Sequence, residues 1–175
     1  MRRGRGGRGK RWNLKIDRQG PVTAADGIVV VPTAATLFAM RLDTGATVWR
    51  ATNPGGYGDY GMQYGAGLLY VEGGDGEVLA YEAATGKVIW RRRLATFPND
   101  PRRRSTALSP YGDALYVTCV DAGLFALNSA DGRVRWRYTT LGPLGDKPSV
   151  AGLVFVRLED GFIQAIAPPV QWTTA

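Results

Sequence analysis

The stretch Gly76-Glu-Val-Leu-Ala-Tyr-Glu-Ala-Ala-Thr-Gly-Lys-Val-Ile-Trp90 decides the fold, because the chain repeats it. Related stretches end at Trp49 and Trp136, each with a glycine four residues and an alanine ten residues before the tryptophan. Shorter versions end at Trp12 and Trp172, so the five tryptophans follow one another at steps of 37, 41, 46 and 36 residues. A period of about forty residues with several short strands per unit is typical of β-propeller blades.

The repeated stretch has a direct physical interpretation. A Thr-Gly or Asp-Gly pair between two strands is typical of a hairpin turn, because glycine adopts the positive φ that other residues resist. The tryptophan on the next strand is large enough to fill the wedge between neighbouring sheets, and the alanine on the strand before it keeps the sheet narrow. We therefore expect structural blade anchors at Trp12, Trp49, Trp90, Trp136, Gly45, Gly86 and Gly132.

Alternation of apolar and polar residues divides each complete unit into four short strands, and no segment has sustained helical periodicity. The second unit, for example, gives strands at 62–66, 68–72, 77–82 and 87–92. The sequence thus predicts an all-β protein, a β-propeller of about four four-stranded blades. The predicted parts are a disordered tail at 1–11, a lone strand at 12–16, and blades at about 20–52, 60–94, 104–139 and 146–175.

The composition excludes several kinds of function. None of the 175 residues is histidine, which removes His-based acid–base catalysis, Ser-His-Asp triads and histidine metal sites. Cys119 is the single cysteine, and we expect it to be a small strand residue facing a packing layer. No apolar run is long enough to span a membrane. No apolar stretch follows the charged N-terminus either, so the sequence as given predicts no signal peptide and leaves the compartment unknown.

The net charge of +7 comes from one end of the chain. Residues 1–18 hold eight Lys/Arg and one acid, whereas residues 19–175 hold fourteen residues of each sign. Residues 1–11 are interpreted as a disordered Arg/Gly tail. Such a tail can make weak, salt-sensitive contacts with RNA, although it carries no aromatic side chain to stack on bases. Nucleic acid is therefore not an expected partner except through this tail.

The units resemble the repeat of the pyrroloquinoline-quinone (PQQ) propellers, whose blades follow Gly-x-Val/Leu-x-Ala-Φ-x-x-x-Thr-Gly-Lys-x-x-Trp. Residues 76–90 match this pattern almost throughout, and residues 36–49 and 123–136 are close to it. The resemblance implies that the tryptophans dock one blade on the next. The family includes quinone-dependent alcohol and sugar dehydrogenases. It also includes non-catalytic relatives, such as the propeller lipoprotein of outer-membrane protein assembly and sensor domains of kinases, and its members are often periplasmic or extracellular.

The features of the dehydrogenases are missing. Those enzymes have a vicinal Cys-Cys pair over the quinone, an Asp base, a calcium ion held by Glu and Asn, and usually eight blades. Here Cys119 stands between Thr118 and Val120, and no residues match the base or the calcium ligands by motif. The sequence therefore predicts no catalytic residue, no metal site and no cofactor. PQQ and calcium belong only to the alternative that the chain is a fragment of a PQQ-dependent alcohol or sugar dehydrogenase.

Two loops are candidate interaction sites. The loop at 53–61 combines glycines with tyrosines, a composition seen in recognition loops, and the loop at 95–104 ends in three arginines suited to a carboxylate or phosphate. Each joins the last strand of one unit to the first strand of the next, so we expect both on one face of the arc. The candidate residues are Tyr57, Asp59, Tyr60, Arg102, Arg103 and Arg104.

The fourth unit is incomplete, because Pro168-Pro169 replace its last turn and proline cannot donate to a sheet ladder. The lone strand at 12–16 is of the right type to complete it. It could do so within one chain, as a closed four-bladed ring, or between two chains, as an eight-bladed ring; the third alternative is an open arc. The ring sizes of the family, seven or eight blades, favour an open half-propeller that needs a partner half.

The leading functional hypothesis is a non-catalytic PQQ-like β-propeller repeat module that acts as a binding or protein-interaction scaffold. Its expected partner is another protein or a second half-propeller, which in a homodimer is a second copy of the chain. The dehydrogenase fragment is the alternative, and an Arg/Gly-tailed nucleic-acid binder is the second alternative.

Overall fold

The structure is a computed structural model that describes residues 12–169 except 14, 16, 18–19, 56–60, 75, 95–105, 120–122 and 145–146. These residues form antiparallel strands and no helix, which confirms the all-β prediction. The strands are β1 (Thr23–Ala25), β2 (Ile28–Pro32), β3 (Thr36–Arg41), β4 (Thr47–Thr52), β5 (Met62–Gly65), β6 (Leu68–Gly73), β7 (Glu77–Glu82), β8 (Val88–Arg93), β9 (Thr106–Tyr111), β10 (Ala114–Cys119), β11 (Gly123–Asn128), β12 (Val134–Tyr138), β13 (Ser149–Ala151), β14 (Leu153–Arg157) and β15 (Ile163–Ile166).

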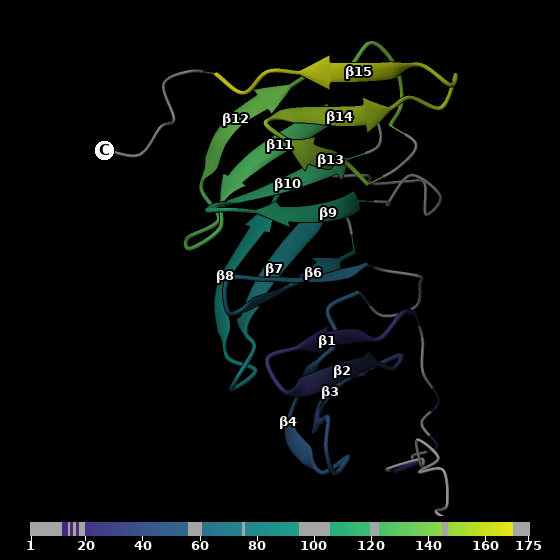
Figure 1. Ribbon diagram of the computed structural model, residues 1–175, viewed down its shortest axis with the longest axis vertical. Helices are drawn as coiled ribbons and strands as arrows, with labels where there is room; N and C mark the ends of the chain where they lie inside the picture. The colour runs from purple at the N-terminus through teal and green to yellow at the C-terminus, as the bar shows by residue number, and fades with distance from the viewer. Residues whose placement is uncertain are drawn as a thin grey trace, which may run out of the picture.

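The strands form four sheets in which neighbours in the sequence are neighbours in the sheet. Blade one is β1–β4, blade two β5–β8, blade three β9–β12, and blade four has only the three strands β13–β15. Figure 1 shows the blades following one another along the long axis, from blade one at the bottom to blade four at the top. The predicted succession of about four PQQ-like blades is confirmed, and the described sheets form an arc whose ends do not meet.

Each complete blade has the same register around its tryptophan. Ala39 pairs with Trp49, Ala80 with Trp90, and Ala126 with Trp136, so the constant spacing in the sequence corresponds to a constant register. Directly after each of these alanines the ladder shifts by one residue, so the fourth strand carries a β-bulge beside its tryptophan. A bulge bends a strand and increases its twist, and here it occurs three times at the same place.

The cores of the molecule lie between blades. We call the face that a blade turns toward the following blade its trailing face, and the opposite face its leading face. Val30, Ala39 and Trp49 on the trailing face of blade one share a buried core with Leu69 and Leu79 on the leading face of blade two. Equivalent cores join blade two to blade three and blade three to blade four. Burial of apolar side chains at these three junctions therefore supplies the main driving force for folding.

The first strands of the blades lie along the inside of the arc, where β1 is next to β5, and β9 is next to both β5 and β13. The Thr23 hydroxyl donates to the carbonyl oxygen of Met62 over 3.2 Å, and the Lys147 ammonium donates to the side-chain oxygen of Gln63 over 3.4 Å. The outer strands carry the tryptophans. No helix among the described residues is long and apolar enough to cross a membrane.

Candidate interaction surfaces at the blade junctions

Two tryptophans make the same contact with the following blade. The indole Nε1 of Trp49 donates to the carbonyl oxygen of Ala83, and that of Trp90 donates to the carbonyl oxygen of Ser129, both over 2.8 Å. Both side chains are more than 90% buried. Each acceptor lies just after the third strand of the next blade, so one indole joins two sheets through packing and a hydrogen bond.

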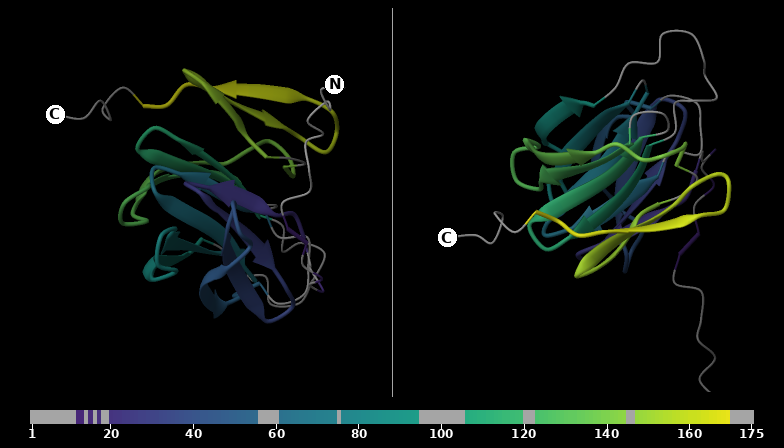
Figure 2. Two further views of the ribbon diagram at one scale, coloured as in Figure 1. Left: turned by 60° about the horizontal axis from the view of Figure 1, so that its bottom comes forward. Right: turned by 90° about the horizontal axis from the view of Figure 1, so that it is seen from above.

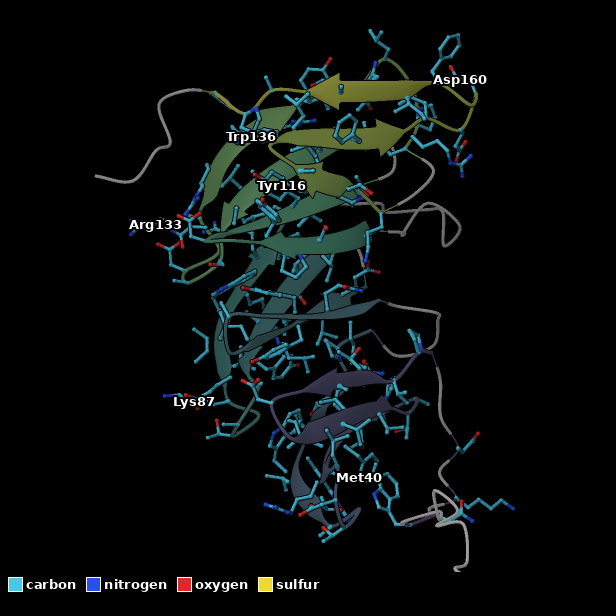
Figure 3. All side chains as sticks on the ribbon, in the orientation of Figure 1. Met40, Lys87, Tyr116, Arg133, Trp136 and Asp160 are labelled. Carbon is cyan, nitrogen blue, oxygen red and sulfur yellow. The ribbon has the colours of Figure 1, made fainter. Side chains whose placement is uncertain are left out.

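The turn glycines make room for these rings. A Cβ atom on Gly86 would lie 2.6 Å from Trp49 ring carbons, and a Cβ on Gly132 would lie 2.6 Å from Cε3 of Trp90. Both glycines also have a positive φ, +74° and +68°. Two independent constraints, backbone conformation and close approach, therefore require glycine at these turns. Lys87 and Arg133, which follow the two turn glycines, lie on one side of the arc (Figure 3).

Trp12 repeats this contact on blade one. Its Nε1 donates to the carbonyl oxygen of Leu42 over 2.8 Å, and a Cβ on Gly45 would lie 2.8 Å from its Cδ2. Trp12 therefore sits on blade one as Trp49 sits on blade two. The described residues of the predicted lone strand, Trp12, Asn13 and Lys15, belong to no sheet. The lone strand at 12–16 stays a prediction.

Trp136 is the exception among the repeated tryptophans. It is only half-buried, and no acceptor for its Nε1 is found among the described residues. In blades one to three the turn glycine lies six residues after the paired alanine; six residues after Ala165 the chain has Gln171, preceded by Pro168-Pro169. The segment of blade four that corresponds to the turn receiving the indole in blades two and three therefore has a different sequence. The energetic role of all the blade anchors stays a prediction, which substitutions can test.

A cavity of about 360 Å³ lies beside Trp136, between blades three and four. Its lining includes three aromatic side chains, of which Tyr116 meets Trp136 edge-on at 6.0 Å and Tyr111 is 53% exposed. Figure 3 shows Trp136 and Tyr116 at the end of blade three nearest to blade four. We call this cavity the Trp136 pocket; its principal lining residues are Tyr111, Asp113, Tyr116, Arg135, Trp136 and Pro168.

One ion pair marks the rim of the Trp136 pocket. The guanidinium of Arg135 donates to both carboxylate oxygens of Asp113, over 2.9 Å and 2.6 Å. The hydrogen bond from Arg135, together with its charge, holds the pKa of Asp113 below its ordinary value. Burial raises the pKa of Tyr116, so this phenol stays a neutral hydrogen-bonding group. The pocket thus offers aromatic surface beside an ion pair in which the charge of Arg135 is already balanced by Asp113. This combination suits a polypeptide segment better than a free anion.

The trailing face of blade four is a second candidate surface, since no described element covers it (Figure 2, right). Phe155 pairs with Ala165 as Tyr116 pairs with Ala126, yet Phe155 is 36% exposed whereas Tyr116 is 8% exposed. Leu153 and Ile163 are exposed on the neighbouring positions. We call Leu153, Phe155, Ile163 and Ala165 the end face of blade four. The exposure of this face was not predicted, because the strands of blade four have the same alternation of apolar residues as the strands of the buried blades.

No catalytic or metal-binding constellation is apparent in the part of the chain that the structure describes. No group of three or more Cys, Asp or Glu side chains in that part could hold a metal ion. Cys119 is fully buried, and burial, reinforced by the charge of Glu72, raises the pKa of its thiol to about 12. It is therefore a poor nucleophile, and its predicted place in a packing layer is confirmed.

The two loops predicted as interaction sites lie outside the described residues, as does the basic tail. The roles of Tyr57, Asp59, Tyr60, Arg102, Arg103 and Arg104 stay predictions. The Trp136 pocket was not predicted, although the sequence holds its signal: the distance from Ala165 to the next tryptophan is seven residues instead of ten, with two prolines in between.

Antiparallel four-stranded sheets joined by a repeated Gly-x₃-Trp stretch define the class of the PQQ-like β-propeller repeat proteins. A family model described as "Outer membrane protein assembly factor BamB" matches residues 4–167. The chain belongs to this family.

Individual relatives agree with the family match. The chain is 31% identical over 148 residues to the outer membrane protein assembly factor BamB of Burkholderia pseudomallei, a match covering 82% of this chain and 37% of the relative. It is 37% identical over 76 residues to the quinoprotein alcohol dehydrogenase PedH of Pseudomonas putida, which covers 40% of this chain and 12% of the enzyme. The crystal structure of BamB from Moraxella catarrhalis superposes with a TM-score of 0.68 at 19% identity, over 83% of this chain and 42% of that one. The chain thus spans well under half the length of these relatives.

Proposed function

We propose that the chain is a non-catalytic PQQ-like propeller module that acts as a protein-interaction scaffold. The observation that carries the proposal is the match of residues 4–167 to a family named for outer membrane protein assembly. The proposed partner is accordingly a polypeptide on its way to the outer membrane, and the proposed place of action is beside that membrane. No cofactor takes part.

The Trp136 pocket is the proposed contact site for a segment of the partner. Tyrosine and tryptophan dominate the binding energy of protein interfaces, because each buries a large apolar area and keeps a polar group for a hydrogen bond. Tyr111 is exposed at the pocket, and the indole N–H of Trp136 is available for an acceptor on the partner, as judged from the described residues. A backbone carbonyl of an extended segment would meet that N–H as Ala83 and Ser129 meet Trp49 and Trp90.

Binding of an unfolded outer-membrane β-barrel protein tests the proposal. The probe is diluted from urea and its binding to the immobilised chain is measured by biolayer interferometry, with a folded water-soluble protein as the negative control. We expect Tyr111→Ala to weaken binding about tenfold, because loss of one aromatic contact costs on the order of 1–2 kcal/mol. Tyr138→Ala removes another exposed tyrosine of blade three outside the pocket and should leave binding unchanged. Equal binding of the probe and the folded control would contradict the scaffold role.

The dehydrogenase fragment remains the second candidate, because the most nearly identical segment quoted above belongs to a quinoprotein alcohol dehydrogenase. The chain with added PQQ and calcium should not reduce an artificial dye in the presence of ethanol or glucose. Calorimetric titration with PQQ should likewise give no heat of binding. Quinone-dependent dye reduction would overturn the non-catalytic assignment.

A further inference from the structure

The register of blade three brings together the floor and the aromatic wall of the Trp136 pocket. Ala126 on β11 pairs with Tyr116 on β10 and with Trp136 on β12, so a small side chain lies between the two aromatic residues of blade three that Figure 3 labels. Residues that pair directly across strands point to the same face of a sheet. The buried Ala126 is therefore the floor of a cavity that both rings line.

Two prolines of blade four complete the lining of the pocket. Pro168 and Pro169 follow β15, and Pro168 is half-buried there. The volume of about 360 Å³ lies at the small end of the range for ligand pockets, which is about 300–1,000 Å³. Aromatic-lined grooves are the surfaces on which proline-rich segments dock in several unrelated classes of domain. The lining thus resembles that kind of groove in the residue types that it presents.

The polar side chains of the lining favour a ligand that offers acceptors and no donors. The carboxylate of Asp113 already receives two hydrogen bonds from Arg135. The indole of Trp136 can only donate, and the phenols of Tyr111 and Tyr116 can donate as well. No acceptor for these three groups is found in the part of the chain that the structure describes. A proline residue has a carbonyl oxygen and no N–H, so a run of prolines supplies acceptors alone.

Two other kinds of segment fit the pocket less well. An acidic segment would have to separate Arg135 from Asp113, whose charges already balance. An added β-strand needs a row of free backbone groups along a strand edge, whereas this pocket is lined mainly by the β9–β10 turn, the β13–β14 turn and the faces of strands. A polyproline II segment makes no internal hydrogen bonds, so its carbonyl oxygens stay free for donors such as those of the pocket.

We infer that the Trp136 pocket binds a proline-rich segment in the polyproline II conformation. Its proline rings pack against Tyr111 and Trp136, and one of its carbonyl oxygens accepts from the indole N–H. Such a segment is already ordered before it binds, so docking costs little conformational entropy. The inference rests on the proposed function, because it names the kind of segment that the same pocket takes from a partner polypeptide.

Fluorine NMR of the chain labelled with 5-fluorotryptophan tests the inference. The probe is an uncharged octapeptide of L-proline, and the control is its D-proline mirror image, which has the same composition and the opposite helical hand. We expect the Trp136 resonance, identified by its absence from Trp136→Phe, to shift and saturate with the L-peptide and to stay unchanged with the D-peptide. This comparison on the wild-type chain does not depend on the folding of any variant.

Two substitutions at one position separate the ring from its hydroxyl. Tyr111 is 53% exposed, so its variants should stay folded, which circular dichroism checks. Tyr111→Ala should weaken binding of the L-peptide about tenfold, because it removes an aromatic contact. Tyr111→Phe keeps the ring and loses one donor, so the loss should be about threefold. Tyr138→Ala, at an exposed tyrosine of blade three outside the pocket, should leave binding unchanged.

Three outcomes would overturn the inference: no saturating shift, equal shifts with both peptides, or a shift confined to another tryptophan. Comparison with the unfolded barrel protein separates this inference from the proposed function. If that protein binds through Tyr111 and the L-peptide does not bind, the scaffold role stands and the inference is wrong. If the L-peptide binds at Trp136 and the barrel protein binds no better than the folded control, the inference stands and the proposed class of partner is wrong.

Discussion

At the scale of single residues, Trp49 and Trp90 each lie against a turn glycine of the following blade. The indole ring lies where a Cβ on the turn glycine would lie, so neither residue can be changed without affecting the other. The same indole satisfies a backbone carbonyl at the junction. A tryptophan of this kind contributes apolar burial and a buried hydrogen bond at one position.

The tryptophans should differ in their contribution to stability according to their surroundings. Trp90→Ala should lower the free energy of unfolding by about 3–5 kcal/mol, because it removes a fully packed ring and leaves the Ser129 carbonyl without its donor. Trp136→Ala should cost roughly half as much, since this ring is half-buried beside a cavity. Urea denaturation measures both. Equal losses, or a loss below about 1 kcal/mol for Trp90→Ala, would reject the anchoring role.

Two glycines with nearly the same backbone conformation allow the cost of backbone strain to be measured separately from the cost of crowding. Gly86 and Gly152 have φ values of +74° and +77°, but only Gly86 has a neighbour, the Trp49 ring, within reach of a new Cβ. Gly152→Ala should cost about 1 kcal/mol from backbone strain alone. Gly86→Ala should cost a further 1–3 kcal/mol, roughly, from overpacking against the indole. Thermal unfolding of the two variants compares the effects, and equal losses would mean that the indole moves aside freely.

The buried thiol of Cys119 should make stability depend on pH in the alkaline range. Its pKa is raised from an ordinary 9.0 to about 12, so above pH 9 the unfolded chain releases a proton that the folded chain keeps. The stabilisation is therefore fully present below pH 9 and is lost as the pH rises toward 12. Between pH 8 and pH 10 the wild type should lose about 1 kcal/mol more than Cys119→Ala, which shares all its tyrosines. Parallel losses would show that the thiol is not desolvated.

At the scale of elements, the sequence predicted what depends on local spacing. The alternation located the strands to within about two residues. The alanine ten residues before each tryptophan is its partner across the ladder, which the spacing was not used to predict. The β-bulge beside each tryptophan was not predicted, because a bulge depends on the twist that packing imposes on the whole sheet. The exposure of Phe155 was not predicted either, since exposure depends on which blade follows and not on the strand itself.

At the scale of the whole molecule, the four described blades make a stack with three interior junctions, in which the buried cores join each blade to the next. In such an array stability is approximately a sum of terms for single repeats and for the junctions between them, so each junction contributes its own term. The sequence favoured an open half-propeller among three alternatives only through the ring sizes of the family, because ring closure depends on the angle between blades. Neither spacing nor composition determines that angle.

The constant indole–carbonyl contact at the junctions also bears on how such proteins evolve. The step from Trp49 to Trp90 is 41 residues and the step from Trp90 to Trp136 is 46, yet the indole–carbonyl distance at the two junctions is 2.8 Å in both cases. Part of the difference lies in the connections between blades, with nine residues between β4 and β5 and twelve between β8 and β9. Mutation can therefore lengthen a connection without changing the junction between two blades. Recombination can likewise duplicate or delete a whole repeat and still leave compatible faces on either side.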